Sequence, residues 1–568
     1  MPSINFKGKA LVQNYHLLVP HHELKPAKSK SLTDKVSLHD NLVVHGDNLK
    51  ALKALLPYYH GKVKCIYIDP PYNTGKEEWS YNDNVNSPMM QEWLGKTVDR
   101  EDLTRHDKWL CLMMPRLRLL KEFLAYDGVI FISIDDNELH RLRCLMDELY
   151  DEENFVGTIV WRNVTDNNPT NISTEHEYLV CYARKKESLP PVWKAENLPI
   201  KDKLIELGNQ FKKKYSDNEE RQRKYSEWFN ENKVYLWPFD RYKYIDDGGI
   251  YTGSQSVHNP GKEGYRYDVI HPVTKKPCQE PMMGYRFPPE TMDQLLAEKR
   301  ILFGEDETKI IELKLYVHEY KAKLPSLIEM DTRLGANELR SIFPEKKRPF
   351  DFPKPSELLH EILSFVADKN AIILDAFAGS APTAQAVLAL NKEDGGSRRF
   401  ILIENEGFAD SLTAERIRRV IKGVPKAKDE ALRKGLGGSF SFIEVGNAMH
   451  LESILKGKKL PSYQDLAGYV FYTATGEEFD LRAIKRRTGF IGESANYDVY
   501  LLYEPDLDYL KNTALTLDMA RKMPKGSRKR RLVFAPTKYL DSIHLEENYI
   551  DFCQLPFEIY KAVRPKKA

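Results

Sequence analysis

The chain has 568 residues, of which 42% are hydrophobic, as in a globular protein with sizeable cores, and this length suggests roughly three to four domains. Its 85 Lys and Arg residues almost balance its 83 Asp and Glu residues, so the net charge of +2 neither requires nor excludes a nucleic-acid partner. The sequence contains no apolar run of about 18 residues, no signal-peptide pattern and no phosphate-binding loop, which argues against a membrane protein, a secreted protein and an ATP-driven motor.

The six cysteines are scattered along the chain and form no C-x-x-C pair. This pattern indicates free thiols in a reducing compartment and gives no sign of a zinc site or a disulfide framework. We therefore expect a cytoplasmic protein without a bound metal.

Residues 1–40 are polar and are interpreted as an N-terminal arm. From residue 41 to about residue 154, strand-like and helix-like runs alternate, with apolar strands predicted at 42–45, 63–68 and 128–134. Strands that are separated by helices predict a parallel sheet of the α/β class.

This alternation stops between residues 155 and 347, where a charged helical stretch is followed by a segment rich in Gly, Tyr and Asp. We interpret this region as an inserted, separately shaped unit. The alternation resumes over residues 348–445, and residues 446–568 are predicted to form a last domain with mixed strands. The sequence therefore predicts one doubly wound sheet that is interrupted by an insert and then completed.

The most informative stretch is Asp69-Pro70-Pro71-Tyr72, which directly follows the strand predicted at 63–68. In open α/β sheets, ligands bind outside the carboxyl ends of the strands. Both prolines lack an N–H group, so the turn offers the Asp69 carboxylate and a proline carbonyl as acceptors beside an aromatic ring. Two acceptors can bind the two N–H bonds of an exocyclic NH2 group while Tyr72 stacks on the ring that carries it. A tight turn after a strand is the plainer interpretation of these four residues alone.

A second turn, made of small residues, follows the strand predicted at 371–374. Residues 375–380 read Asp-Ala-Phe-Ala-Gly-Ser and lead into a helix, whose first N–H groups a ligand can approach. At the end of the next strand, Glu404 can bind both hydroxyls of a ribose. The turn has no basic residue for a phosphate, which favours a nucleoside-like ligand, although tight packing of strand on helix would also produce such a turn.

With both turns present, the chain resembles the β-class DNA adenine-N6 methyltransferases, and most closely the modification subunits of type III restriction systems. Five segments carry this resemblance, at residues 46–49, 69–75, 128–138, 352–359 and 375–380. The resemblance implies a doubly wound, Rossmann-like methyltransferase sheet that uses S-adenosylmethionine and is formed by residues 41–154 (catalytic half) and 348–445 (cofactor half). It also implies a target-recognition domain at 155–347 and a C-terminal α/β domain at 446–568.

The function that the resemblance implies is methyl transfer from S-adenosylmethionine to N6 of an adenine flipped out of duplex DNA, in a restriction-modification or phage-defence system of a bacterial or archaeal cytosol. Aspartate at position 69, where serine marks cytosine-N4 enzymes, favours adenine. The implied catalytic residues are Asp69, Pro70, Pro71 and Tyr72. The implied cofactor-binding residues are Asp47, Asn48, Asp69, Lys354, Pro355, Ser356, Asp375, Phe377, Ala378, Gly379, Ser380 and Glu404.

The insert is expected to read the DNA sequence, since aromatic and basic side chains supply phosphate and base contacts. The candidates for DNA contacts are Trp161, Arg162, Tyr244, Arg266 and Arg286. The polar loop 163–171 and the basic run 521–531 are further candidates, although solvated surface is the more common role of such residues. His176-Glu177-Tyr178 offers no third metal ligand and is interpreted as structural. The expected partners are duplex DNA, a second copy of the chain, and a separate ATPase–nuclease or other defence-system subunit.

One position departs from the family pattern. The family usually continues from Gly-Ser into Gly-Thr, whereas Ala381 and Pro382 follow Ser380 in this chain. Proline is tolerated in a first helical turn, but a methyl group at 381 would crowd the methionine part of the cofactor. This departure leaves open a DNA-recognition subunit that transfers methyl groups weakly or not at all. A cytosine-N4 or RNA amino methyltransferase on the same scaffold is the other open alternative.

Overall fold

The computed structural model describes residues 3–74, 105–163, 171–195, 199–233, 236, 239–259, 261–425, 427, 430–448, 460–523 and 529–555. Most of the polar loop 163–171 and the centre of the basic run 521–531 lie outside these residues. The chain divides into two compact units. The first unit comprises residues 1–191 and 325–568, and the second comprises residues 192–324.

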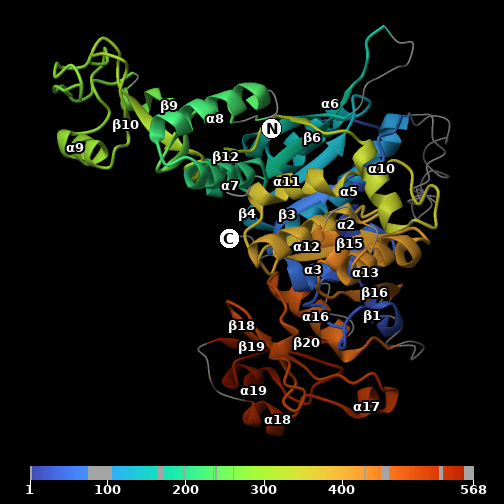
Figure 1. Ribbon diagram of the computed structural model, residues 1–568. Coiled ribbons are helices and arrows are strands. Elements are labelled where there is room, and N and C mark those ends of the chain that lie inside the picture. Colours follow the sequence, from blue (N-terminus) through green and yellow to red (C-terminus); the bar gives the residue numbers. More distant parts are fainter. Residues whose placement is uncertain are drawn as a thin grey trace. The chain divides into compact units, whose positions relative to one another are not determined.

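The first unit contains a ten-stranded mixed sheet with the order β1-β16-β2-β15-β14-β3-β4-β6-β5-β13 (Figure 1). Strands β16 to β4 in this order run parallel, β1 is antiparallel at one edge, and β6 is a reversed strand between β4 and β5. The strands are β1 (His22–Pro26), β16 (Ser441–Ala448), β2 (Leu42–His45), β15 (Arg399–Glu404), β14 (Ile372–Asp375), β3 (Val63–Ile68), β4 (Leu124–Ile134), β6 (His176–Ala183), β5 (Phe155–Arg162) and β13 (Leu327–Glu329).

Helices cover both faces of this sheet. One group shares a hydrophobic core with alternate residues of the strands, such as Ile372 and Leu374 of β14; it comprises α3 (Asn48–Tyr59), α5 (Arg105–Phe123) and α6 (Leu139–Tyr150). Because successive strand side chains point to opposite faces, Ile373 and Asp375 face away from that core. On that side α11 (Ser356–Val366) and α12 (Pro382–Asp394) pack against each other, and α13 (Glu415–Lys422) packs against α12. The expected α/β sheet between helices is confirmed.

The centre of the sheet is a topological switch point. Strands β14 and β3 are neighbours, with Asp375 paired to Tyr67 and Leu374 paired to Ile66. From β14 the chain continues to β15 on one side, whereas from β3 it continues to β4 on the other. The connections therefore diverge above the carboxyl ends of β14 and β3, and this is where open α/β sheets bind ligands. The turns that follow Asp375 and Ile68 thus meet although about 300 residues separate them in the sequence.

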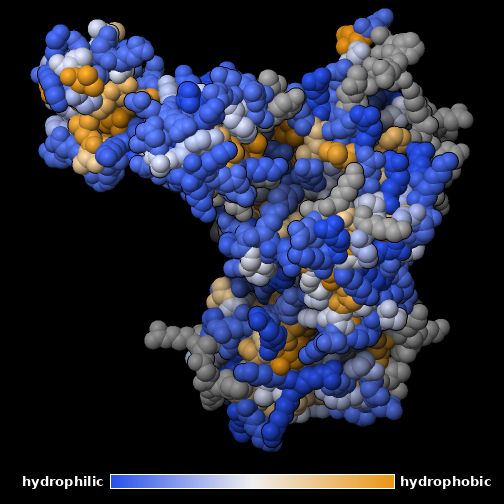
Figure 2. Space-filling view, in the orientation of Figure 1, coloured by the Kyte–Doolittle hydropathy of each residue, from blue (hydrophilic) through white to orange (hydrophobic). Residues whose placement is uncertain are grey.

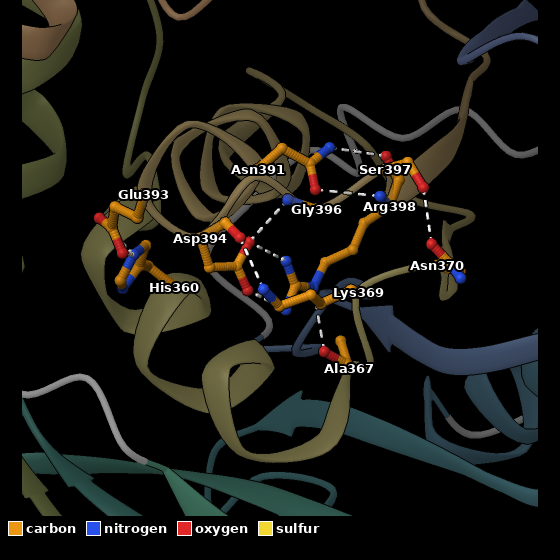
Figure 3. A network of polar contacts seen from close by, with 10 residues as sticks. All are labelled: His360, Ala367, Lys369, Asn370, Asn391, Glu393, Asp394, Gly396, Ser397 and Arg398. Carbon is orange, nitrogen blue, oxygen red and sulfur yellow. Dashed lines mark hydrogen bonds and ion pairs between the residues drawn. The ribbon is translucent and has the colours of Figure 1, made fainter.

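The turn from α12 to β15 is fixed by a polar network near the amino end of β15 (Figure 3). The Arg398 guanidinium donates to both carboxylate oxygens of Asp394, at 3.0 and 2.9 Å, and to the Ala367 carbonyl at 3.0 Å. Gly395 adopts a left-handed conformation with φ 68°, which favours glycine. Glu393, which like Asp394 belongs to α12, pairs with His360 of α11. This network lies at the amino end of the strand, so it anchors β15 without facing the switch point.

Three boundaries differ from those expected. Residues 1–40 are more than an arm, because β1 pairs with β16 and Val12, Val19 and Leu24 are buried in the main core. Strands β5 and β6 belong to the ten-stranded sheet, since β6 pairs with β4 along its length. The compact second unit is therefore 192–324, shorter than the predicted insert 155–347.

The C-terminal residues form their own four-stranded sheet, of order β17-β18-β19-β20. However, Val470 and Phe471 of α16 (Tyr463–Thr475) are buried in the core that α3 shares, so these residues belong to the first compact unit. The strands are β17 (Phe490–Glu493), β18 (Tyr497–Leu501), β19 (Arg530–Ala535) and β20 (Ile550–Gln554). The short helices are α17 (Leu507–Asn512), α18 (Leu517–Lys522) and α19 (Ser542–Glu547).

The second unit combines a four-stranded sheet, of order β10-β11-β9-β8, with helices that cover it. Its strands are β8 (Tyr244–Asp246), β9 (Gly249–Ser254), β10 (Ile301–Leu302) and β11 (Glu312–Tyr316), with β7 (Lys194–Ala195) paired to β12 (Ala322–Lys323). Its helices are α7 (Pro199–Lys214), α8 (Asn218–Asn232) and α9 (Pro289–Ala297). In Figure 2 hydrophobic surface gathers near the α9 end of this unit and, separately, over the C-terminal sheet. Among the described residues, no helix is long and apolar enough to span a membrane.

Candidate active site

The turn after β3 presents hydrogen-bond acceptors at the edge of the sheet. The indole N–H of Trp109, on α5, donates to the Pro71 carbonyl at 2.7 Å. No hydrogen bond to the Pro70 carbonyl is found within the described residues. Neither proline has an N–H group of its own. The Asp69 carboxylate and the Pro70 carbonyl are therefore the acceptors that the turn can offer to a ligand.

Four side chains meet at this turn and form what we call the Lys354 cluster: Asp69, Tyr72, Glu177 and Lys354. The Tyr72 hydroxyl lies 2.9 Å from Asp69 Oδ1 and 2.9 Å from Glu177 Oε2. Lys354 Nζ donates to the Tyr72 hydroxyl oxygen at 2.7 Å and to Glu177 at 2.9 Å, and it lies 3.3 Å from Asp69. Lys354 was predicted to contact the cofactor, whereas in the structure its ammonium group lies at the predicted catalytic turn.

Burial and neighbouring charge shape the electrostatics of the cluster. Burial raises the pKa of the Asp69 carboxyl above its ordinary value, the nearby Glu177 charge raises it further, and Lys354 opposes this shift. Although burial alone would lower the pKa of Lys354, the carboxylates of Asp69 and Glu177 raise it. The ammonium also lies 4.8 Å from the Tyr72 ring centre and 5.4 Å from that of Trp161. Lys354 therefore stays charged between two carboxylates.

The turn after β14 is enclosed, and its carboxylates are held by the protein itself. Asp375 is 1% exposed and accepts hydrogen bonds from the Phe377 N–H at 3.0 Å and the Thr383 hydroxyl at 2.5 Å. Glu404, also 1% exposed, accepts from the N–H groups of Gly379 at 2.7 Å and Glu406 at 2.9 Å. Burial raises the pKa of both carboxyls to about 7. Two acidic groups with neutral-range pKa values therefore border this turn.

The small residues of this turn adopt the conformation that ends a strand and starts a helix. The Ala378 N–H donates to the Ile403 carbonyl at 3.1 Å, which ties the turn to β15. Ala381 precedes α12 and is fully buried with φ 64°, a left-handed conformation in which its methyl group is strained. Pro382 occupies the first turn of α12, where its missing N–H has no consequence.

Asp47 and Asn48 lie beside this turn at the start of α3. Asp47 caps the helix by accepting from the Lys50 N–H at 3.0 Å. The Asn48 amide donates to the Ala376 carbonyl at 3.3 Å and accepts from the buried Arg116 guanidinium at 2.6 Å. Arg116 comes from α5 and also lies 3.6 Å from Asp47. The sequence gave no sign of Arg116, because its partners come from other segments.

A second polar network links Ser356 and Ser380 through Glu338 of α10 (Arg333–Ile342). Ser356, which opens α11 after Pro355, donates its N–H to Glu338 at 3.3 Å and its hydroxyl to the same carboxylate. The fully buried Arg416 donates to Glu338 at 2.9 Å and to the Ser380 carbonyl at 3.1 Å. The network therefore joins two segments that were predicted to bind the cofactor, one at Ser356 and one at Ser380.

A cavity of about 820 Å³ opens beside the Lys354 cluster. Phe352, immediately before Pro353, is 79% exposed and has φ 51°, a strained conformation for an aromatic residue. The cavity lining combines aromatic rings with basic side chains, and among these are Tyr72, Lys354, Phe350, Phe352, Arg333, Arg340, Lys347 and Arg348. Planar and anionic ligands suit such a lining. Sequence reasoning did not single out the basic residues at 333–348.

The candidate DNA-contact residues are divided between the two units. Trp161, on β5, is 0% exposed and donates its indole N–H to the Met330 carbonyl at 2.7 Å, so in this structure it has no surface to present to DNA. Arg162, next to it, is exposed and lies 3.2 Å from Glu329. In the second unit Tyr244 stacks on Tyr251, Arg266 is exposed beside Glu280, and Arg286 is exposed. The roles of Arg162, Tyr244, Arg266 and Arg286 stay predictions.

Comparison with known proteins gives consistent relatives. A family model described as DNA methylase matches residues 63–411. The Mod subunit of the type III restriction-modification enzyme EcoP15I of Escherichia coli is 47% identical over 413 residues, which are 71% of this chain and 64% of that protein. The StyLTI Mod subunit of Salmonella typhimurium is 32% identical, over 70% of this chain and 59% of that protein. The EcoPI Mod subunit of Escherichia phage P1 is 30% identical, over 76% and 70% respectively. The chain thus spans less than two thirds of the first two relatives.

Proposed function

The chain belongs to the DNA methylase family, and from this premise we propose that it transfers a methyl group from S-adenosylmethionine to the N6 amino group of adenine in duplex DNA. The relatives named above are Mod subunits of type III restriction-modification enzymes, which supports a role in such a system.

The observation that carries this proposal is the pair of hydrogen-bond acceptors on the turn after β3, which lies beside the turn after β14. The Asp69 carboxylate and the Pro70 carbonyl can accept the two N–H bonds of an exocyclic amino group, because Trp109 occupies only the Pro71 carbonyl. Accepting both bonds draws the nitrogen lone pair out of conjugation with the ring and makes it a better nucleophile. The turn after β14 lies next to it in the sheet, where a methyl donor would be within reach.

The residues around the second turn fit S-adenosylmethionine by the chemistry of their donors and acceptors. Each carboxylate has about four acceptor positions, so Asp375 and Glu404 can keep their present bonds and still accept from ribose or amino groups. The small residues Ala376 and Ala378 leave room for an approaching ligand. Ser356, Lys354 and Pro355 would border the methionine end. The cofactor, when bound, supplies an electrophilic methyl group on sulfur.

The chain's own contribution to the reaction is orientation. Asp69 and the Pro70 carbonyl hold the amino nitrogen, and the Tyr72 ring provides a stacking surface for the base. An adenine amino group cannot reach these residues inside a duplex, so we propose that the base is flipped into the cavity beside the Lys354 cluster. Arg333, Arg340 and Lys347 would bind flanking phosphates there. Correct placement of the reacting atoms lowers the barrier without a covalent intermediate.

The remaining elements of the proposal concern partners. We propose double-stranded DNA as substrate, a homodimer as the working form, and a separate ATPase–nuclease subunit in the complete system. The second unit, 192–324, would contribute to reading the target sequence. The cytoplasm is the proposed location.

A cytosine-N4 methyltransferase is the second candidate, because the amino group of cytosine also offers two N–H bonds to the same acceptors. Incubation of unmodified DNA with the protein and S-adenosylmethionine, followed by nucleoside analysis by mass spectrometry, separates the two. We expect N6-methyladenine from the wild type and none from Asp69→Ala. Glu393→Gln, a change in the network at the amino end of β15, is the matched control and should leave the yield unchanged. N4-methylcytosine would instead support the cytosine-N4 candidate. Unmodified DNA from well-folded protein would contradict the proposed methyl transfer.

A further inference from the structure

Glu177 reaches the active site because β6 runs against its neighbours. In a parallel sheet the carboxyl ends of the strands form the binding edge, so a reversed strand brings its first residues to that edge. Glu177 is the second residue of β6, and Tyr178 beside it pairs with Ile134 at the end of β4. The residue that seemed structural in sequence is thus placed at the catalytic turn.

The orientation of the Glu177 carboxylate is fixed by a hydrogen bond to its oxygen that faces away from Tyr72 and Lys354. The side-chain amide of the buried Asn163 donates to Glu177 Oε1 at 2.7 Å. The Asn163 backbone N–H in turn donates to the Glu175 carbonyl at 3.0 Å. The other oxygen, Oε2, therefore faces Tyr72 and Lys354, at 2.9 Å from each.

The hydrogen atoms of the Lys354 cluster cannot satisfy every acceptor at once. The Tyr72 hydroxyl carries one proton, yet Asp69 and Glu177 lie at the same distance of 2.9 Å from it. The Lys354 ammonium is nearer to Glu177, at 2.9 Å, than to Asp69, at 3.3 Å. Glu177 thus competes with Asp69 for the same donors.

We propose that Glu177 is a positioning residue for methyl transfer, which draws Lys354 and the Tyr72 proton toward itself and so leaves the Asp69 carboxylate free to accept the target amino group. This inference rests on the proposed function. Without the Glu177 charge, Lys354 would pair fully with Asp69 and Tyr72 would donate to it. Both interactions would compete with the N–H bond of the substrate.

In Glu177→Gln we expect turnover to fall while cofactor binding stays unchanged. This variant keeps the size of the side chain and its acceptor for Asn163 but removes the charge. We expect kcat to fall by about 10- to 100-fold, since misplaced acceptors disturb the attack geometry. The Kd for S-adenosylmethionine, measured by calorimetry, and the melting temperature should stay unchanged. Glu177→Asp, which keeps the charge, should recover part of the lost kcat.

The pH dependence gives a readout that a merely structural role would not move. The Glu177 charge raises the pKa of Asp69, so its removal should lower that pKa and shift the acid limb of the rate profile to lower pH. The charged and titratable groups that face Asp69 are Lys354, Glu177, Tyr72, Tyr67 and Asp375. Only Glu177 changes in the experiment, and Glu393→Gln serves as a remote charge-loss control.

The decisive experiment compares wild type, Glu177→Gln and Glu177→Asp in single-turnover methylation across pH, together with a carbon-13 carboxyl titration of Asp69. Slower turnover with an acid limb and an Asp69 titration at lower pH supports the inference. Unchanged turnover and titration overturn it, as do loss of fold or of cofactor binding. If the wild type methylates no DNA, the proposed function fails, and the Asp69 titration still decides whether Glu177 acts on that carboxylate.

Discussion

The two turns that meet at the switch point are built in opposite ways. The turn at Asp69 is held by its own Tyr72 and by side chains from three other segments, Trp109, Glu177 and Lys354, and a cavity opens beside it. The turn at Asp375 is enclosed, and its carboxylates are held mainly by backbone N–H groups, together with the Thr383 hydroxyl. Under the proposed function this difference would be a division of labour, since side chains that can rearrange suit a changing reaction centre, whereas backbone contacts suit a cofactor that binds in one pose.

The largest effect that this comparison predicts is on turnover in Asp69→Asn. The substitution removes the charge and replaces one acceptor oxygen by a donor, so we expect kcat to fall by about 10²- to 10³-fold. The free energy of unfolding should change by less than about 1 kcal/mol, because the charge of Asp69 is already disfavoured by burial. Single-turnover methylation and thermal denaturation check both parts. A large loss of stability would mean that the turn is structural.

The opposite result is expected at the enclosed turn. Glu404→Ala leaves the N–H groups of Gly379 and Glu406 without their acceptor in a buried place, which should lower the free energy of unfolding by about 2–4 kcal/mol. The affinity of the variant for S-adenosylmethionine should also fall. Chemical denaturation measures the first effect and calorimetry the second. If Glu404→Ala keeps its stability and its full affinity for S-adenosylmethionine, the contrast between the two turns would be contradicted.

The buried carboxyls also predict a dependence of stability on pH. Glu404 and Asp375 have pKa values of about 7 when folded, whereas in the unfolded chain they titrate near pH 4. Between these values the folded protein holds more protons than the unfolded chain, so their contribution to stability is lost as pH rises from about 4 to about 7. The loss is on the order of 3–4 kcal/mol per group, since each pKa unit corresponds to about 1.4 kcal/mol. Melting temperatures from pH 5 to pH 8 should fall less steeply in Glu404→Gln than in the wild type, and equal slopes would refute the assignment.

The smallest effect concerns Ala381, whose left-handed conformation suits glycine better. Ala381→Gly should relieve strain and raise the free energy of unfolding by about 0.5–1 kcal/mol, after the greater freedom of glycine in the unfolded chain is counted. If the methyl group crowds the cofactor, affinity for S-adenosylmethionine should rise as well. Unchanged affinity in a stabilised variant would show that the departure from the family pattern has no bearing on cofactor binding.

Local patterns allowed the positions of the residues at the two turns to be predicted from the sequence, while their roles stay predictions. The strands before Asp69 and Asp375 are short apolar runs that end in turn residues, and such signals need no knowledge of the fold. The position of Glu404 at the end of β15 followed in the same way. No local pattern shows that the two turns lie side by side, and the structure shows this through the pairing of β14 with β3.

Residues that act through distant partners escaped prediction. Glu177 is informative only once β6 is known to be reversed beside β4. Arg116 and Glu338 lie within ordinary helical patterns, and their roles come from Asn48 and Ser356, at other places in the chain. The burial of Trp161 depends likewise on Met330, far along the sequence. Such contacts belong to tertiary structure and leave no local signal.

Methyl transfer to adenine is best tested by sequencing that detects modified bases in unmodified plasmid incubated with the protein and S-adenosylmethionine. We expect N6-methyladenine at one short recurring motif with the wild type, and none with Asp69→Ala. Folded protein that binds the cofactor but leaves every adenine unmodified would contradict it.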